Sequence, residues 1–188
     1  MEMVSLTTLW LPILLSAVVV FAASSIIHMV LPYHRGDYKK VPNEDKMLEA
    51  LRPLGMVPGT YHFPHCASQK DMRTPEHMEK LKKGPVGLMT IFPSGMPNMG
   101  KYLLCWFLYC LAVSFFVAYL AGRTLGPGTA NLAVFRVAGT VAFVAYGLGM
   151  THESIWGGRA WSTTFKFYFD GLVYGLLTAG VFGWLWPR

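Results

Sequence analysis

The chain has 188 residues, of which 53% are apolar and 14% aromatic, and its mean hydropathy is +0.38. This size allows one helical bundle with a small insert and excludes a second large domain. The formal net charge is +6, but eleven of the sixteen Lys and Arg residues fall within residues 33–101, beside long apolar stretches. Positive loops of this kind are typical of membrane proteins, so we expect no nucleic-acid partner.

Four apolar stretches divide the chain, at residues 6–32, 102–121, 129–151 and 165–186. Each approaches or exceeds the ~20 residues that a helix needs to cross ~30 Å of hydrocarbon. The sequence therefore predicts an all-α membrane protein, with four transmembrane helices and a small α+β cytoplasmic insert between helices 1 and 2. Its expected parts are a first transmembrane helix (1–32), a basic cytoplasmic insert (33–101) and a three-helix transmembrane region (102–188).

The distribution of positive charge predicts the orientation. The tail from Met1 to Val4 carries no positive residue and lacks the basic region of a cleavable signal peptide, so we expect the first helix to remain as an anchor. Loop 33–101 is then cytoplasmic and both termini lie outside. Arg123 is the only basic residue in the outer turn 122–128, which agrees with this arrangement. These observations predict a multi-pass protein of the bacterial cytoplasmic (inner) membrane.

Small residues recur at helical spacing in three of the apolar stretches, and such residues let helix backbones approach one another in lipid. We expect these faces to pack together. They consist of Cys110, Ser114, Ala118 and Gly122; Ala138, Ala142, Ala145 and Gly149; and Gly171, Gly175, Ala179 and Gly183.

Within the basic insert, the sequence predicts two short helices and two short strands. Asn43 is a typical N-cap and Pro53 ends the first helix, while Thr74 caps a second helix that ends at Gly84. The β-favouring runs 60–63 and 88–92 are expected to pair as a two-stranded ribbon. A ribbon this short is marginal alone, so it needs another surface to lie on.

Ionisable groups within or beside the spans are candidate functional residues. Asp170 follows Lys166 by one helical turn, and an intrahelical ion pair is the simplest interpretation. The predicted topology also brings five residues to one depth on the cytoplasmic side, where they can relay protons, bind an ion or hold a polar headgroup. Alternatively, each reaches water separately or caps its own helix end. The five residues are His28, His152, Glu153, Lys166 and Asp170.

Two further sets of residues are candidate binding sites. Arg136 lies near the outer end of the third stretch, where we expect it to anchor the helix or to contact a lipid phosphate or another anion. His62, His65 and Cys66 are weak metal candidates, because they supply only part of the usual four-ligand zinc set. No nucleophile elbow, P-loop or dinucleotide-binding motif is present, so the sequence predicts no metal, no cofactor and no catalytic residue.

Several segments together resemble an uncharacterised family of small bacterial four-span integral membrane proteins. They are residues 10–33, 157–161, 170–175 and 182–187. The resemblance covers much of the chain and implies the fold and a membrane location, but it implies no substrate and no site residue.

From these observations the sequence favours a structural or accessory membrane protein over an enzyme. Its expected partners are membrane lipids together with subunits of a larger membrane complex or further copies of itself. The alternative is a protein that handles a small molecule, a proton or an ion through the cluster of His28, His152, Glu153, Lys166 and Asp170. A membrane enzyme that acts on a lipid or a quinone is a third, less supported class.

Overall fold

The computed structural model describes residues 3–188, so the first two residues of the predicted translocated tail lie outside the described residues. The chain divides into two compact units. One contains the chain up to Asp37 together with Asn98–Arg188, and the other is Tyr38–Pro97. Residues 33–37, which we expected in the insert, therefore belong to the first unit.

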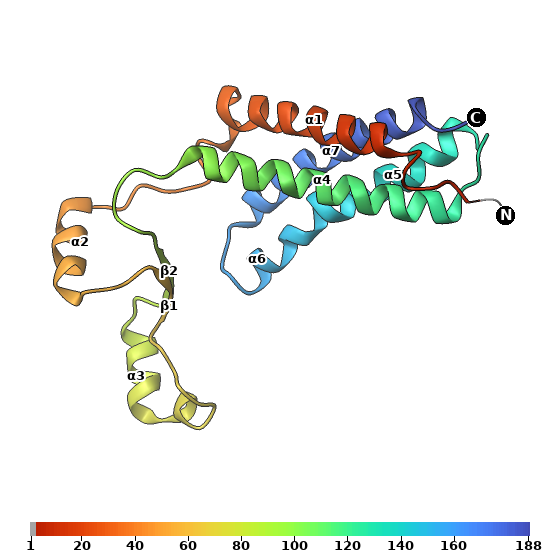
Figure 1. Ribbon diagram of the computed structural model, residues 1–188. Coiled ribbons are helices and arrows are strands. Elements are labelled where there is room, and N and C mark those ends of the chain that lie inside the picture. Colours follow the sequence, from red (N-terminus) through yellow and green to blue (C-terminus); the bar gives the residue numbers. More distant parts are fainter. Residues whose placement is uncertain (1–2) are drawn as a thin grey trace. The chain divides into compact units, whose positions relative to one another are not determined.

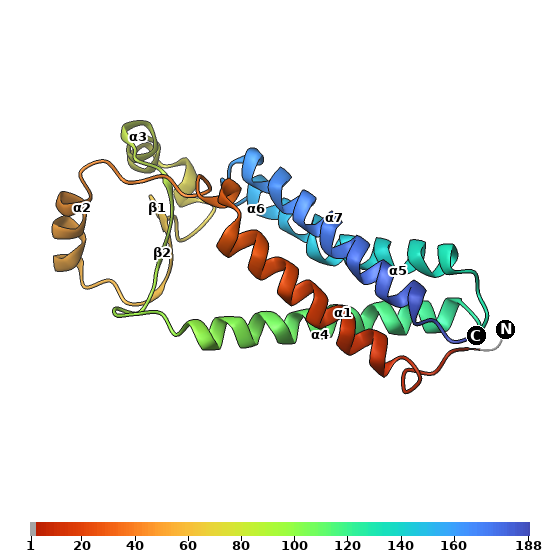
Figure 2. The ribbon, with the colours of Figure 1, turned by 90° about the horizontal axis from the view of Figure 1, so that it is seen from above.

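The first unit is a helical bundle (Figure 1). Its long helices are α1 (Trp10–Ser25), α4 (Met99–Thr124), α5 (Asn131–Tyr146) and α7 (Trp161–Trp184), and the short helix α6 (Thr151–Ile155) precedes α7. The pairing of α5 with α7 is the most extensive, while α1 packs on both α4 and α7. Figure 2 shows that α1 crosses α4 at an angle while α7 lies beside α5.

Three helical segments of the described chain are long and apolar enough to cross a membrane. They are Trp10–Val30, Met99–Thr124 and Asn131–Ile155. The fourth predicted span forms α7, which has 24 residues. It contains Lys166 and Asp170 and is rich in Gly and Thr, and it is not apolar enough to count among these three segments. The chain is thus a predominantly helical membrane protein, and its fourth crossing stays a prediction.

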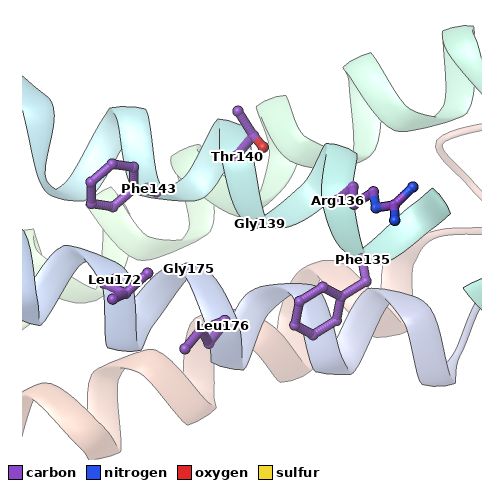
Figure 3. A pocket seen from close by; sticks show the side chains of 8 residues that line it. All are labelled: Phe135, Arg136, Gly139, Thr140, Phe143, Leu172, Gly175 and Leu176. Carbon is purple, nitrogen blue, oxygen red and sulfur yellow. The ribbon is translucent and has the colours of Figure 1, made fainter. Parts of the chain in front are cut away.

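The predicted small-residue faces of α4 and α7 are buried along their whole length. Of the predicted α5 face, Ala138 and Ala142 are buried and Ala145 is partly buried, while Gly149 is exposed and lies beyond the end of the helix at Tyr146. The helices α5 and α7 approach each other closely: a Cβ atom added to Gly175 would lie 3.1 Å from the Gly139 carbonyl oxygen. Figure 3 shows these two glycines facing each other.

The two ends of the described chain contact the last turn of α4 and the loop that follows it. The Val4 N–H donates to the Gly122 carbonyl oxygen at 3.0 Å, and the Gly128 N–H donates to the Pro187 carbonyl oxygen at 2.9 Å. The Trp186 indole N–H donates to the Gly126 carbonyl oxygen at 3.0 Å. These bonds hold both ends at the same end of the bundle, as Figure 1 shows.

The second unit contains the predicted short elements, namely α2 (Glu44–Leu51), β1 (Gly59–Phe63), α3 (Pro75–Lys83) and β2 (Gly87–Ile91), and its strands pair antiparallel. The Thr74 hydroxyl caps α3 as expected, by accepting from the His77 N–H at 3.3 Å. Asn43 instead adopts a left-handed backbone with φ of 53° and makes no side-chain cap. No residue of Tyr38–Pro97 is buried, so this unit has no core of its own.

Candidate functional site

The site begins where α1 ends. A single π-helical turn, Ile26–Val30, carries His28, and Leu31 then adopts the extended conformation that a following proline favours. A 3₁₀ turn, Pro32–His34, redirects the chain after the proline. This turn brings residues 33–37 against α7.

Asp170 of α7 lies at the centre of the site and is only 1% exposed. One carboxylate oxygen accepts a hydrogen bond from the Tyr33 hydroxyl. The other, Oδ2, lies 2.9 Å from His34 Nε2 and 4.0 Å from His28 Nε2. Three side chains from the end of α1 and the turn after it therefore converge on one buried carboxylate.

A second carboxylate, Asp37, extends this arrangement. Its Oδ2 lies 2.6 Å from His34 Nδ1, and its Oδ1 accepts from Lys166 Nζ at 2.6 Å. Lys166 also donates to the Tyr33 carbonyl oxygen at 2.5 Å. The His34 ring thus lies between two carboxylates, with one ring nitrogen facing each of them.

Local environment fixes the protonation of the two groups that lie outside the spans. Burial raises the pKa of the Asp37 carboxyl, but hydrogen bonds from Lys166 and His34 outweigh burial and hold this pKa below the ordinary value of 3.8. Burial and the bond to Asp170 raise the pKa of the Tyr33 phenol well above its ordinary 10.0. At neutral pH Asp37 is therefore ionised and Tyr33 is a hydrogen-bond donor.

Two imidazoles and one carboxylate form a set of potential metal ligands. One ligand atom from each of His28, His34 and Asp170 lies within 4.8 Å of the other two. Over residues 3–188 this is the one place where three or more His, Cys, Asp or Glu side chains meet so closely.

A cavity of about 530 Å³ opens beside these ligands. His28 and Asp170 form part of its wall, and the Tyr174 hydroxyl lies 3.5 Å from His28 Nε2. The remaining wall is mostly apolar and aromatic, and Trp106 is fixed in it by a 2.7 Å hydrogen bond from its indole N–H to Ser24 Oγ. The other lining residues are Ser25, Met29, Met99, Leu103, Tyr109, Ala145, Tyr146, Met150 and Phe167.

The structure brings together His28, Lys166 and Asp170 of the predicted cluster but not the other two residues. His152 Nε2 lies 3.3 Å from Glu153 Oε1, and Glu153 also pairs with Arg159 at 3.8 Å. His152 is exposed and Glu153 is half-buried, and within residues 3–188 their ion pairs and hydrogen bonds stay outside the site. After a 3₁₀ turn at Leu148–Met150, α6 continues the helical segment of α5, and the side-chain contacts of His152 and Glu153 lie within residues 149–159.

The expected intrahelical ion pair between Lys166 and Asp170 does not form, and Lys166 pairs with Asp37 instead. In the described chain the carboxylate within 4 Å of Lys166 Nζ is that of Asp37. The i,i+4 spacing is present, but Asp170 is buried and already accepts hydrogen bonds from Tyr33 and His34. The flexible Lys166 side chain therefore reaches Asp37, where it also donates to the Tyr33 carbonyl oxygen.

The weaker candidates belong to other elements: Arg136 lies in α5, and the others lie in the second unit. Arg136 is exposed, and Figure 3 shows its guanidinium directed away from the Gly139–Gly175 contact. His62 Nδ1 contacts the Pro64 carbonyl oxygen at 3.1 Å, and the Cys66 thiol donates to the Ser68 carbonyl oxygen at 3.0 Å. Among residues 3–188, the insert's histidines and cysteine form no group of three converging ligands.

Sequence reasoning missed Tyr33, His34 and Asp37 as site residues, because they were assigned to the basic insert. One signal was available. His34 and Asp37 are ionisable residues at a three-residue spacing, directly after the proline that ends the first apolar stretch. Such a proline allows the chain to turn back onto the membrane-facing bundle.

The bundle and the buried site define a helical membrane protein with a His–carboxylate centre beside an apolar cavity. Comparisons with protein-family models, with curated proteins and with solved structures found no match.

Proposed function

We propose that the chain is an integral membrane protein that handles a cation at the site formed by His28, His34 and Asp170. The observation that carries this proposal is the convergence of these three side chains, within 4.8 Å, around a carboxylate that is 1% exposed. Of the three functions that the sequence left open, this geometry favours ion handling.

The balance of charge at the site supports the proposal. A buried carboxylate is costly unless positive charge or hydrogen bonds compensate it. Lys166 is engaged by Asp37, and within residues 3–188 the basic side chains within 4 Å of the Asp170 carboxylate are histidines. Hydrogen bonds from Tyr33 and His34 compensate the Asp170 carboxylate in part, and a cation bound between it and the histidines would add positive charge there. The adjoining cavity supplies a route by which an ion and its ligands reach it.

Thermal unfolding of the purified protein in detergent tests this proposal. The protein is heated at fixed pH with Mg²⁺, Ca²⁺, Mn²⁺ or Zn²⁺, each added separately. We expect at least one cation to raise the Tm, because a ligand that binds only the folded state at 100 times its Kd stabilises that state by about 2.7 kcal/mol. Asp170→Asn and His34→Gln should lose the shift, whereas Glu153→Gln, which changes a carboxylate outside the site, should keep it.

Two results contradict the cation proposal. The first is that no cation shifts the Tm of the wild-type chain. The second is that the shift persists in both Asp170→Asn and His34→Gln. Because each variant alters a different side chain, failure of one to fold still leaves the other as a test.

For the membrane placement we propose four crossings, with α7 as the fourth and the insert on the cytoplasmic face of the bacterial inner membrane. The 24-residue length of α7 and the eleven basic residues of 33–101 support this topology. An even number of crossings also agrees with the two described ends contacting the last turn of α4 and the loop that follows it. A tag inserted next to Lys80 should be protected in intact cells and accessible after lysis; labelling in intact cells argues against the topology.

On the opposite face, this topology gives Arg136 the lipid phosphate groups of the outer leaflet as partners. Its guanidinium is exposed, which supports such a contact. Arg136→Gln should weaken retention of anionic lipid during detergent purification, measured by mass spectrometry of bound lipid. Equal retention by both proteins contradicts this role.

The second candidate function is that of an accessory subunit of a larger membrane complex or homo-oligomer. The insert supports it: no residue of Tyr38–Pro97 is buried, and Phe92 and Leu54 are among its large exposed apolar side chains. Native mass spectrometry from mild detergent should then give an assembly that Phe92→Ser weakens. A stable monomer from the same preparation counts against this function.

A further inference from the structure

The arrangement of the site also identifies the kind of cation it suits, an inference that rests on the proposed cation-handling function. We infer that His28, His34 and Asp170 form a three-ligand site for a divalent metal ion of the zinc class, with the fourth coordination position open toward the cavity.

The donor atoms and their spacing support this class of metal. Imidazole nitrogens favour zinc and its transition-metal neighbours, whereas Mg²⁺ and Ca²⁺ favour oxygen ligands alone. Zinc bonds of about 2.0–2.1 Å place adjacent tetrahedral ligands about 3.4 Å apart. The two measured separations from Asp170 Oδ2, 2.9 Å to His34 and 4.0 Å to His28, lie on either side of this value.

Asp37 supplies the support that a metal-binding histidine requires. Metal-ligating histidines usually donate their other ring N–H to a carboxylate, which fixes the tautomer and the ring orientation. His34 Nδ1 lies 2.6 Å from Asp37 Oδ2 while Nε2 faces the metal position, and Lys166 holds Asp37 from its other oxygen. Asp37 is thus a positioning residue, and Tyr33 orients Asp170 in the same way through its hydroxyl.

The number of ligands indicates an open site. Structural zinc sites are closed by four protein ligands, whereas sites that bind an exchangeable ligand have three protein ligands and one free position. His28 and Asp170 both line the cavity, and His28 is 40% exposed on its side chain. A molecule with an oxygen-donor head and an apolar body matches both the metal position and the aromatic wall around Trp106.

Metal binding is measured on the full-length protein in detergent, purified without a polyhistidine tag. Isothermal titration with Zn²⁺ and the visible spectrum of the Co²⁺-loaded protein report affinity and coordination. We expect one metal per chain. His34→Gln and His28→Gln should lower Zn²⁺ affinity by at least about 100-fold, and Asp37→Asn by about 10- to 100-fold. His152→Gln is the matched control and should bind like the wild type.

The open position is tested on the Co²⁺ protein with two hydroxamates. Acetohydroxamate should change the visible spectrum, and octanohydroxamate should do so at concentrations on the order of 100-fold lower, because its chain occupies the apolar cavity. A spectrum that neither compound changes contradicts the open position. Equal affinity for the two compounds contradicts the inference that the open coordination position faces the cavity.

The outcomes separate this inference from the proposed function on which it rests. Stabilisation by Mg²⁺ or Ca²⁺, lost in Asp170→Asn and without measurable Zn²⁺ binding, leaves cation handling in place and overturns the zinc-class site. Absence of binding by every cation overturns both. Zn²⁺ binding that survives His28→Gln and His34→Gln equally shows that the metal is held elsewhere in the chain.

Discussion

The contact between α5 and α7 at Gly171 has no room for a side chain. A Cβ atom at this position would lie 2.5 Å from the Cα of Gly147 and 2.6 Å from its nitrogen. Both are backbone atoms, so no side-chain rotation relieves the clash. Since carbon atoms pack at about 3.5–4.0 Å, Gly171→Ala requires the two helices to separate by about 1 Å at this point.

The cost of that separation follows from the packing of the pair. A gap of 0.5–1 Å forfeits a quarter to a half of the dispersion energy between facing atoms, and overpacking typically costs about 1–3 kcal/mol. Because α5 and α7 form the most extensive helix pair, we expect Gly171→Ala to lower the free energy of unfolding by about 3 kcal/mol, at the upper end of this range.

Gly180→Ala on the same helix is the matched control, since no atom lies within 4 Å of the added Cβ. Its expected effect is at most about 1 kcal/mol, in the stabilising direction, from helix propensity. Unfolding in mixed micelles with increasing SDS, followed by tryptophan fluorescence, measures both variants. Cation-induced stabilisation should also weaken in Gly171→Ala, because Asp170 precedes the clash. Equal stability of the two variants refutes the close-packing argument.

Three further predictions concern the polar contacts. Lys166→Met removes the cationic partner of buried Asp37 and should lower stability by about 1–3 kcal/mol in thermal unfolding. The folded-state pKa of Asp37 lies below its ordinary value of 3.8, so the ionised Asp37 stabilises the fold above pH 3.8, and this stabilisation is lost as the pH falls through the folded-state pKa. The Tm difference between wild type and Asp37→Asn should therefore narrow in acid. A difference that stays constant with pH contradicts this prediction. Ser16 Oγ donates to Ser114 Oγ at 3.0 Å, and a double-mutant cycle with alanine should give a coupling energy of about 0.6 kcal/mol; no coupling contradicts the bond.

The bundle was predictable because its signals are local in the sequence. Apolar length indicated the helices, and the four-residue spacing from Gly171 to Gly183 indicated the packing face of α7. The same spacing failed at Gly149, because α5 ends at Tyr146 and the face ends with it. Periodicity specifies a face only as far as the helix continues.

The site was only partly predictable because it depends on a turn rather than on a helix. Predicted depth grouped His28 with Asp170, and in the structure their side chains approach to 4.0 Å. Depth alone also grouped His152 with them, although residues at equal depth need not face one another. His34 and Asp37 entered the site because a proline-containing 3₁₀ turn follows α1, and sequence spacing did not specify where that turn directs the chain.

The bond between His34 and Asp170 joins residues that are 136 positions apart in the sequence. During synthesis, His28 and His34 therefore leave the ribosome long before α7 is made, and until then the Asp170 carboxylate is absent from the site. The proposed ion site is consequently a property of the finished bundle alone. We expect a nascent chain stalled before Asp170 to enter the bilayer yet to bind no metal, so that acquisition of the ion marks the completion of assembly.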